Sequence, residues 1–300
     1  MFEVAIVGGG PAGLTAAIYS ARYGLRTVFF ETFDPVSQLS LAGKVENYPG
    51  FEGKGIDLLD RMKQQALKAG SEGKMEKIEK VLRKGDNFLL LGENEYEAKA
   101  VIIATGGKHR EANVEGEKDF IGRGVSYCAT CDGNFFRGKK VIVYGSGKEA
   151  LSDAIYLHDI GCKVMLLSRA PLRAERVMIE EALKRGIEII SNATLRRIEG
   201  SGKVERAAVF FRGKNEEAIL ETDGIFIAVG MRPATDLVAE LGVERDSLGY
   251  IKVDREQRTN VKGVFAAGDC CNNPLKQVVT ACGDGAIAAH SAYRYLREQI

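Results

Sequence analysis

Two cysteines separated by two residues, Cys128 and Cys131, are the side chains of this sequence best suited to chemistry. This spacing lets both thiols reach disulfide geometry across one turn. A C-x-x-C setting also lowers a thiol pKa, and the thiolate is the species that attacks disulfides. Asp132 follows directly and is placed to move a proton to or from a leaving thiol. The segment predicts a catalytic redox dithiol made of Cys128 and Cys131, with Asp132 as its acid.

A zinc site is the main alternative interpretation of this pair. Such a site needs four ligands, commonly a second C-x-x-C or a His pair. Cys270 and Cys271 are adjacent in the chain, and the three histidines are scattered. We therefore predict no metal. Cys162 and Cys282 are interpreted as packing residues, because a free cysteine buries well as a small hydrophobe.

The N-terminus carries the glycine pattern of a dinucleotide-binding fold. Residues 8–13 match G-x-G-x-x-G between a predicted strand, 4–7, and a predicted helix, about 14–23. The glycines permit a tight turn, close approach of a pyrophosphate and close helix packing, and the phosphates bind at the helix N-terminus. A second predicted strand, 27–30, ends at an acid ~20 residues on, where a carboxylate accepts hydrogen bonds from ribose. We predict that a dinucleotide contacts Gly8, Gly10, Pro11, Ala12, Gly13 and Glu31.

The same pattern returns in the middle of the chain. A predicted strand at 140–144 is followed by Gly145-Ser-Gly-Lys-Glu-Ala150, a predicted helix at 151–159 and a strand at 163–167. This second strand ends at Ser168-Arg169 without an acid. An acid there binds the ribose of NAD, whereas an Arg accepts the 2′-phosphate of NADP. The residues predicted to bind NADP are Gly145, Gly147, Arg169 and Arg173; the alternative is that both arginines are solvated charges near Pro171.

Repetition of this unit predicts an α/β fold with two Rossmann-like nucleotide-binding domains, the second inserted into the first. The segment after about residue 242 contains neither glycine pattern, although it includes a predicted final helix near 287–296. We therefore assign residues 1–112 and 243–300 to a discontinuous first domain. Residues 113–242 form the second domain, which carries the cysteine pair.

Composition limits the functional classes. The 42 Lys+Arg and 41 Asp+Glu residues nearly cancel, which argues against nucleic acid as the main partner. No apolar run approaches the ~20 residues that span a bilayer, and the N-terminus lacks the pattern of a signal peptide. We expect a soluble, cytoplasmic protein, in which closely spaced cysteines are redox-active rather than structural.

Residues 122–133, Gly-Arg-Gly-Val-Ser-Tyr-Cys-Ala-Thr-Cys-Asp-Gly, resemble the redox-active segment of the low-molecular-weight thioredoxin reductases. The resemblance covers essentially the whole chain. Residues 8–13 resemble the FAD loop of that family, 45–50 its flavin-contacting loop, and 104–106 the strand end beside FAD. It implies further FAD contacts from Gln38, Asn47, Thr105, Gly106, Gly268, Asp269, Lys276 and Gln277.

The resemblance also implies a function. An FAD-binding domain, residues 1–112 and 243–300, is interrupted by a pyridine-nucleotide-type domain, 113–242, and the two domains rotate between steps of turnover. Electrons pass from NADPH through FAD and the dithiol to thioredoxin or a glutaredoxin-like protein, and the enzyme is a homodimer. Cys131 is the sulfur nearer the flavin, while the cysteine that forms the mixed disulfide is left open.

The sequence departs from the family where the electron donor binds. The family has His-Arg-Arg and then another Arg, whereas this chain has Ser168-Arg169-Ala170 and an apparent one-residue shift of Arg173. One lost arginine removes a contact worth about 1.5–3 kcal/mol. NADPH remains the favoured donor, with NADH, ferredoxin and a deazaflavin cofactor as alternatives. A dithiol oxidase that uses oxygen and a non-catalytic redox sensor are the other functions considered.

Overall fold

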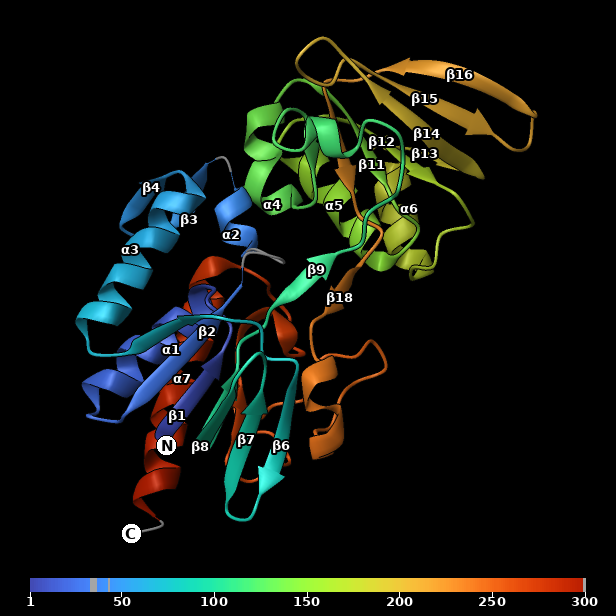
Figure 1. Ribbon diagram of the computed structural model, residues 1–300. Coiled ribbons are helices and arrows are strands. Elements are labelled where there is room, and N and C mark those ends of the chain that lie inside the picture. Colours follow the sequence, from blue (N-terminus) through green and yellow to red (C-terminus); the bar gives the residue numbers. More distant parts are fainter. Residues whose placement is uncertain (33–36, 43, 299–300) are drawn as a thin grey trace. The chain divides into compact units, whose positions relative to one another are not determined.

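The computed structural model describes residues 1–32, 37–42 and 44–298. The chain forms two compact units, which are Met1–Lys108 with Arg232–Ile300 (unit 1) and His109–Met231 (unit 2) (Figure 1). The chain passes between them in two short paired strands, β9 (Gly107–His109) and β18 (Met231–Pro233).

These crossings differ from the boundaries assigned from the sequence. Residues 109–112 fall in unit 2 and residues 232–242 in unit 1. The backbone N–H of Ala234 donates to the Gly106 carbonyl at 3.0 Å, and Leu237 and Val238 are buried in the core of unit 1. These contacts attach the returning segment to unit 1 about ten residues earlier than its sequence suggests.

Unit 1 is built on a seven-stranded sheet. Its strands are β1 (Phe2–Val7), β2 (Thr27–Glu31), β5 (Glu72–Met75), β6 (Lys80–Lys84), β7 (Asn87–Leu91), β8 (Glu95–Ile103) and β19 (Val264–Ala266). Their order is β5, β2, β1, β8, β7, β6, and β19 also pairs with β8. The first four strands and β19 are parallel, while β7 and β6 are antiparallel. Strands β1, β2 and β19 are mostly apolar and buried, because both faces of the sheet are covered there, whereas the edge strand β5 carries Glu72 and Lys74.

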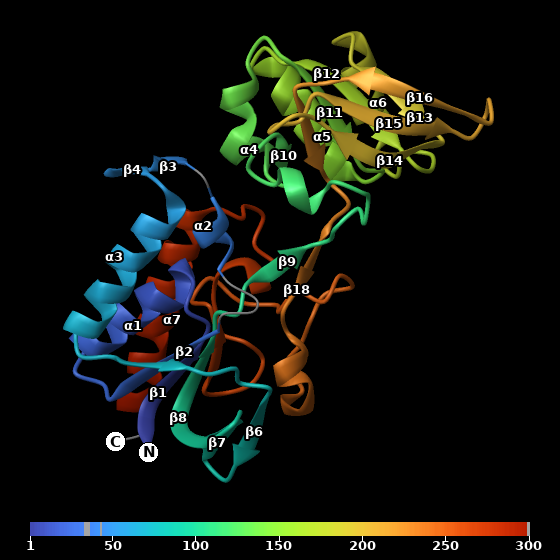
Figure 2. The same cartoon turned by 45° about the horizontal axis from the view of Figure 1, so that its top comes forward.

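Three helices cover one face of this sheet: α1 (Pro11–Arg22), α3 (Gly55–Lys68) and α7 (Val278–Arg297) (Figures 1 and 2). Helices α1 and α7 are in close contact, since a Cβ on Gly285 would lie 2.1 Å from the Ala12 carbonyl oxygen. The short helix η3 (Asp236–Leu241) contributes Leu237 and Val238 to the core on the other face. The smaller elements are α2 (Gln38–Leu41), β3 (Val45–Tyr48), β4 (Phe51–Gly53) and η4 (Gly268–Cys270).

Unit 2 contains a five-stranded parallel sheet and a three-stranded antiparallel one. The parallel strands, in sheet order, are β10 (Val125–Ser126), β17 (Gly224–Ile227), β11 (Lys140–Tyr144), β12 (Lys163–Ser168) and β13 (Glu188–Ser191). Helices α5 (Lys148–Asp159) and α6 (Arg176–Lys184) pack on one face, and β14 (Ala193–Glu199), β15 (Arg206–Phe211) and β16 (Glu216–Glu221) pack on the other. The short elements are η1 (Lys118–Phe120), α4 (Ala129–Asp132) and η2 (Gly133–Phe136).

The helices extend further than the sequence predicted. Helix α1 begins at Pro11 rather than 14, and α5 at Lys148 rather than 151, because glycines act as their N-caps and a proline fits the first helical position. Helix α7 begins at Val278 rather than near 287, since Gln277 and Thr280 form a capping box. None of the described helices is long and apolar enough to cross a bilayer.

Candidate active site and nucleotide-binding loops

Cys128 and Cys131 form a disulfide in unit 2, with their Cα atoms 5.3 Å apart. Cys128 is the N-cap of the one-turn helix α4, and its Sγ accepts a hydrogen bond from the Cys131 backbone N–H at 3.2 Å. The turn follows β10 directly, where Ser126 is paired with Phe226 of β17. The dithiol is therefore attached to the parallel sheet rather than to a long loop, which fixes its backbone.

Asp132, the last residue of α4, is held by a hydroxyl that the sequence analysis did not identify. Its carboxylate accepts a hydrogen bond from the Ser126 hydroxyl at 2.6 Å. The same oxygen of Ser126 accepts a hydrogen bond from the Cys128 backbone N–H at 3.0 Å. Ser126 is only 5% exposed. One buried hydroxyl thus connects the acid to the backbone of a redox cysteine.

The surroundings of Asp132 favour its protonated form. Burial raises the pKa of the Asp132 carboxyl, and the hydrogen bond from Ser126 acts in the opposite direction. A raised pKa increases the proton-bearing fraction near neutral pH, which suits a group that donates a proton to a leaving thiolate.

The first glycine loop is too crowded for side chains. A Cβ on Gly8 would lie 2.1 Å from the Ala104 carbonyl oxygen, and a Cβ on Gly13 would lie 1.8 Å from the Gly8 carbonyl oxygen. Gly10 is the N-cap of α1 and Pro11 follows it; the first turn has no acidic residue and no side-chain cap. The N–H groups of this turn are therefore available to an anion such as a pyrophosphate.

Glu31 lies beside this loop at the end of β2. A Cβ on Gly9 would lie 2.4 Å from the Glu31 Cβ, so the loop passes directly over the acid. The Glu31 carboxylate also forms an ion pair with Lys63 of α3. The carboxylate occupies the place that ribose recognition requires, and Lys63 is a cation partner that the sequence analysis did not identify.

Gly268 and Asp269 lie in η4, against the start of α1. Gly268 has a φ of 77°, and a Cβ there would lie 2.9 Å from the Ala12 Cβ. The Gly268 backbone N–H donates to the Asp284 carboxylate of α7 at 3.2 Å. Burial raises the pKa of the Asp269 carboxyl. The predicted flavin-contacting Asp269 is therefore close to the glycine loop, although more than 250 residues separate them in sequence.

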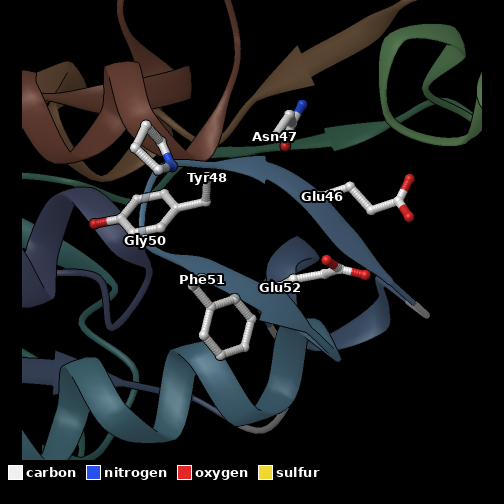
Figure 3. Close-up of a pocket in the computed structure, with 7 residues that line it drawn as sticks. Glu46, Asn47, Tyr48, Gly50, Phe51 and Glu52 are labelled. Carbon is white, nitrogen blue, oxygen red and sulfur yellow. The ribbon is translucent and has the colours of Figure 1, made fainter.

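The hairpin of β3 and β4 lines an open pocket of about 530 Å³ in unit 1 (Figure 3). Asn47 donates a hydrogen bond from Nδ2 to Oε1 of Gln277 at 2.9 Å. The Tyr48 hydroxyl lies 4.0 Å from the Cys282 Sγ of α7. Figure 3 shows the Phe51 ring on the side of α3, where the Arg61 guanidinium lies 5.2 Å from the ring centre. Two predicted FAD-contacting residues, Asn47 and Gln277, thus touch.

Gln38, Thr105 and Gly106 gather where β8 ends. The Gln38 side-chain amide donates to the Gly107 carbonyl, and the Thr105 hydroxyl donates to the Ala234 carbonyl at 2.6 Å. Gly106 has a φ of 64°, which turns the chain immediately after the strand. This is the carboxyl edge of the sheet, where open α/β folds bind their ligands.

Lys276 lies near two buried cysteines. Its ammonium donates to the Cys271 carbonyl and lies 4.4 Å from the centre of the Tyr250 ring. The Sγ atoms of Cys270 and Cys271 are 3.9 Å apart, and both side chains are fully buried. Cys270 also donates to the Ile103 carbonyl at 3.4 Å, and this full burial favours packing roles for both cysteines.

The residues of unit 1 fit the FAD that the resemblance implies. Uncapped N–H groups at α1, a glycine loop that side chains would block, and the Glu31 carboxylate meet at one edge of the sheet. The η4 turn with Asp269 approaches Ala12 at the same helix end. This combination matches the needs of a dinucleotide with an acidic pyrophosphate and hydroxyl-bearing sugars.

The second glycine loop is packed in the same way. A Cβ on Gly145 would lie 2.1 Å from the Ala228 carbonyl oxygen and 2.7 Å from the Ala150 Cβ. Gly147, the N-cap of α5, has open space around it. The first turn of α5 differs from that of α1 in having an acidic residue, Glu149.

The two arginines of the predicted NADP site leave the same sheet edge. Arg169 follows the last residue of β12, and the Arg173 backbone N–H donates to the Ser146 carbonyl at 2.7 Å. The hydroxyl of Ser168 donates to the Ala170 carbonyl and holds the turn between them. Both arginines therefore border the second glycine loop.

Sequence reasoning missed Ser126 and Asp284. Ser126 stands two residues before the first cysteine, so its position in the motif was a usable signal. Asp284 accepts hydrogen bonds from Gly268, from Asn273 at 2.7 Å and from Gln257 at 3.2 Å. These partners come from separate segments, and no local pattern could have identified them.

Comparison with known proteins places this geometry in a family. Residues 2–285 match the family model described as pyridine nucleotide-disulphide oxidoreductase. The chain is 41% identical over 304 residues to a thioredoxin reductase of Listeria monocytogenes, covering 99% of this chain and 95% of the relative. Thioredoxin reductase of Bacillus subtilis is 40% identical over 303 residues, with 99% and 96% covered.

Solved structures agree with these relatives. Thioredoxin reductase from Streptococcus pyogenes is 38% identical with a TM-score of 0.94, and 99% of each chain is covered. The enzyme from Giardia duodenalis is 36% identical with the same TM-score and coverage. The chain therefore belongs to the pyridine nucleotide-disulphide oxidoreductase family, within the low-molecular-weight thioredoxin reductases.

Proposed function

We propose that the chain passes two electrons from NADPH, through FAD, to Cys128 and Cys131, and from there to a disulfide of thioredoxin or a glutaredoxin-like protein. The observation that supports this most directly is the Cys128–Cys131 disulfide with Asp132 held beside it by Ser126. Opening that disulfide takes up two electrons and two protons. The relationship to thioredoxin reductases supports thioredoxin as the partner.

Unit 1 is the proposed FAD-binding unit. FAD, when bound, supplies a two-electron carrier between the nicotinamide and the dithiol. The N-terminus of α1 holds the pyrophosphate, the Glu31 carboxylate accepts hydrogen bonds from ribose, and Asp269 binds the ribityl chain. The full set of proposed contacts is Gly8, Gly10, Pro11, Ala12, Gly13, Glu31, Gln38, Asn47, Thr105, Gly106, Gly268, Asp269, Lys276 and Gln277.

Unit 2 is the proposed catalytic and donor-binding unit. One thiolate of the reduced pair attacks the disulfide of the partner and forms a mixed disulfide. The second thiolate then attacks that bond, which releases the partner as a dithiol and restores Cys128–Cys131. During reduction of the internal disulfide, Asp132 donates its one proton to the departing sulfur, and solvent supplies the second proton. NADPH binds at Gly145 and Gly147, with Arg169 and Arg173 at its 2′-phosphate.

Anaerobic titration of the flavin-loaded protein tests the electron path. We expect NADPH to bleach the flavin absorbance, and subsequent addition of oxidised thioredoxin to restore it. Bleaching by NADH, reduced ferredoxin or reduced deazaflavin, with none by NADPH, would show that the donor is wrong while the dithiol role survives. Rapid peroxide formation from small thiols would instead favour a dithiol oxidase.

Single replacements test the dithiol itself. Cys128→Ser and Cys131→Ser should each retain the flavin spectrum and lose thioredoxin reduction, because either change removes the disulfide. Mixing each variant with oxidised thioredoxin and examining the products for a mixed disulfide assigns the attacking cysteine. Unchanged thioredoxin turnover in both variants would refute the proposal.

We also propose that the enzyme is a cytoplasmic homodimer whose two units rotate between flavin reduction and thioredoxin reduction. The family resemblance supports both properties. Light scattering on the flavin-loaded protein tests the dimer, for which a mass twice that of the 32.6 kDa chain is expected.

A further inference from the structure

Three strands of unit 2 end together at the carboxyl edge of its parallel sheet. Tyr144 of β11 is paired with Leu167 of β12, and Ser168 of β12 is paired with Ser191 of β13. The second glycine loop leaves this edge directly after Tyr144. Ligands of open α/β sheets bind in the crevice outside such an edge.

Arg212 is brought to this edge from a distant part of the sequence. Asn192 follows Ser191, and its carbonyl accepts a hydrogen bond from the Arg212 backbone N–H at 2.9 Å. Arg169 follows Ser168 on the neighbouring strand. Since adjacent strands are about 4.8 Å apart, the chain segments carrying Arg169 and Arg212 leave the sheet next to each other.

The charge of Arg212 is not neutralised within its own unit. Two arginines of the same three-stranded sheet, Arg197 and Arg206, both pair with Glu199. Within the described ranges, by contrast, Arg212 has no carboxylate partner, and neither have Arg169 and Arg173. Three arginines without acidic partners are therefore carried by chain segments that leave this one edge of the sheet.

The phenol of Tyr144 lies among these charges. Its oxygen forms a hydrogen bond with the Leu195 backbone. The positive charges of Arg169, Arg212 and Arg196 all act to lower the pKa of Tyr144, against the larger effect of burial, which raises it. Arg169 and Arg212 therefore both lie close enough to the Tyr144 phenol to affect its pKa, in agreement with the strand pairing.

We propose that Arg212 is a specificity-determining residue that binds the 2′-phosphate of NADPH together with Arg169 and Arg173. It supplies, from the end of β15, the positive charge that the family has immediately after Arg169 and that Ala170 lacks here. A 2′-phosphate carries nearly two negative charges, and guanidinium groups bind phosphate oxygens through two parallel hydrogen bonds. This inference rests on the proposed use of NADPH.

Calorimetric titration with two small ligands tests the inference without turnover. Adenosine 2′,5′-bisphosphate carries the 2′-phosphate, and adenosine 5′-monophosphate lacks it. We expect the flavin-loaded wild-type protein to prefer the bisphosphate. Arg212→Ala should weaken bisphosphate binding about tenfold and leave monophosphate binding nearly unchanged, while Arg212→Lys should recover part of the loss.

Arg206→Ala is the matched control, because it removes the same charge from the same strand at the opposite end, where Glu199 pairs with it. It should leave both affinities unchanged. A preference for the bisphosphate that is as large in Arg212→Ala as in the wild type would overturn the role of Arg212 and leave NADPH as the donor. An equal loss for both ligands would also overturn it, as a general charge effect. A wild-type protein without any preference would overturn the NADPH proposal as well.

Discussion

Ser126 places one hydroxyl between the backbone of Cys128 and the carboxylate of Asp132. A hydroxyl has a single proton to donate, and the 2.6 Å distance to Asp132 assigns that proton to the acid. The lone pairs of the oxygen remain available for the Cys128 N–H. The same segment thus positions the Asp132 carboxylate and the Cys128 sulfur, so a displacement of one group also displaces the other.

Replacing Ser126 by Ala should move the pH profile of thioredoxin reduction. The hydrogen bond from Ser126 stabilises the Asp132 carboxylate and lowers its pKa, so its loss raises the pKa further above the usual value. A step that needs protonated Asp132 declines as pH rises through that pKa. The alkaline limb of kcat against pH should therefore move up by about one pH unit in Ser126→Ala.

Two companion variants separate this effect from a loss of structure. Ser126→Thr keeps a hydroxyl and should keep the original limb, whereas Ser152→Ala, at an exposed position of α5, should change nothing. A lower rate in Ser126→Ala with the limb in its original place would mean that the hydroxyl only supports the fold.

At the scale of elements, the two strand–loop–helix motifs share one steric requirement, which is a glycine directly after the first strand. In each, a glycine at the end of the first strand leaves no room for a Cβ: Gly8 faces Ala104, and Gly145 faces Ala228. Ala104 and Ala228 each directly follow the strand that pairs beside the loop, β8 and β17 respectively. Each glycine is thus required by a contact with a residue far away in the sequence, although the glycine pattern itself is short. This explains why both loops could be located from the sequence alone.

The glycines of the second loop are not equivalent, and this gives a matched pair of variants. In Gly145→Ala the new Cβ would lie 2.1 Å from the Ala228 carbonyl oxygen, so the free energy of unfolding should fall by about 1–3 kcal/mol. In Gly147→Ala the new Cβ meets no atom within 4 Å, and φ is −95°, so stability should hardly change. Urea unfolding followed by circular dichroism measures both. Equal stability of the two variants would contradict this account of the loop.

Helix α7 contributes to the FAD site through Asp284. Its carboxylate accepts hydrogen bonds from the backbone of Gly268 and from the side chains of Asn273 and Gln257. Asp284→Ala leaves these donors without an acceptor, which costs about 1–3 kcal/mol. We expect FAD affinity to fall at least fivefold, because the Gly268–Asp269 turn is then held less firmly.

Equilibrium binding of FAD to the apoprotein, followed by flavin fluorescence, measures this effect. Asp60→Ala, at an exposed position on α3, is the control and should bind FAD as the wild type does. Unchanged FAD affinity in Asp284→Ala would show that the η4 turn keeps its shape without the carboxylate.

For the whole molecule, the sequence was most informative where a short segment determines the structure. The C-x-x-C turn and both glycine loops are of this kind, and their residues lie where the local patterns predict. The domain boundaries predicted from the sequence lie four and eleven residues from the crossings between the units. The crossings were hard to locate because β9 and β18 are three-residue strands without a hydrophobic pattern. The roles of Asp284 and Lys63 depend on contacts between distant segments, which one sequence does not reveal.

The two units should fold independently. Each has its own sheet with a buried hydrophobic cluster on either face. Unit 2 is one continuous segment, so a fragment of residues 109–231 should unfold cooperatively in urea and form the Cys128–Cys131 disulfide. A second fragment that joins residue 108 to residue 232 through a short glycine-serine linker should bind FAD and turn yellow.

Neither fragment should reduce thioredoxin with NADPH, since the flavin and the dithiol would be on separate chains. If the 109–231 fragment is unfolded while the joined fragment binds FAD, the inserted unit depends for its folding on the unit that surrounds it in the sequence.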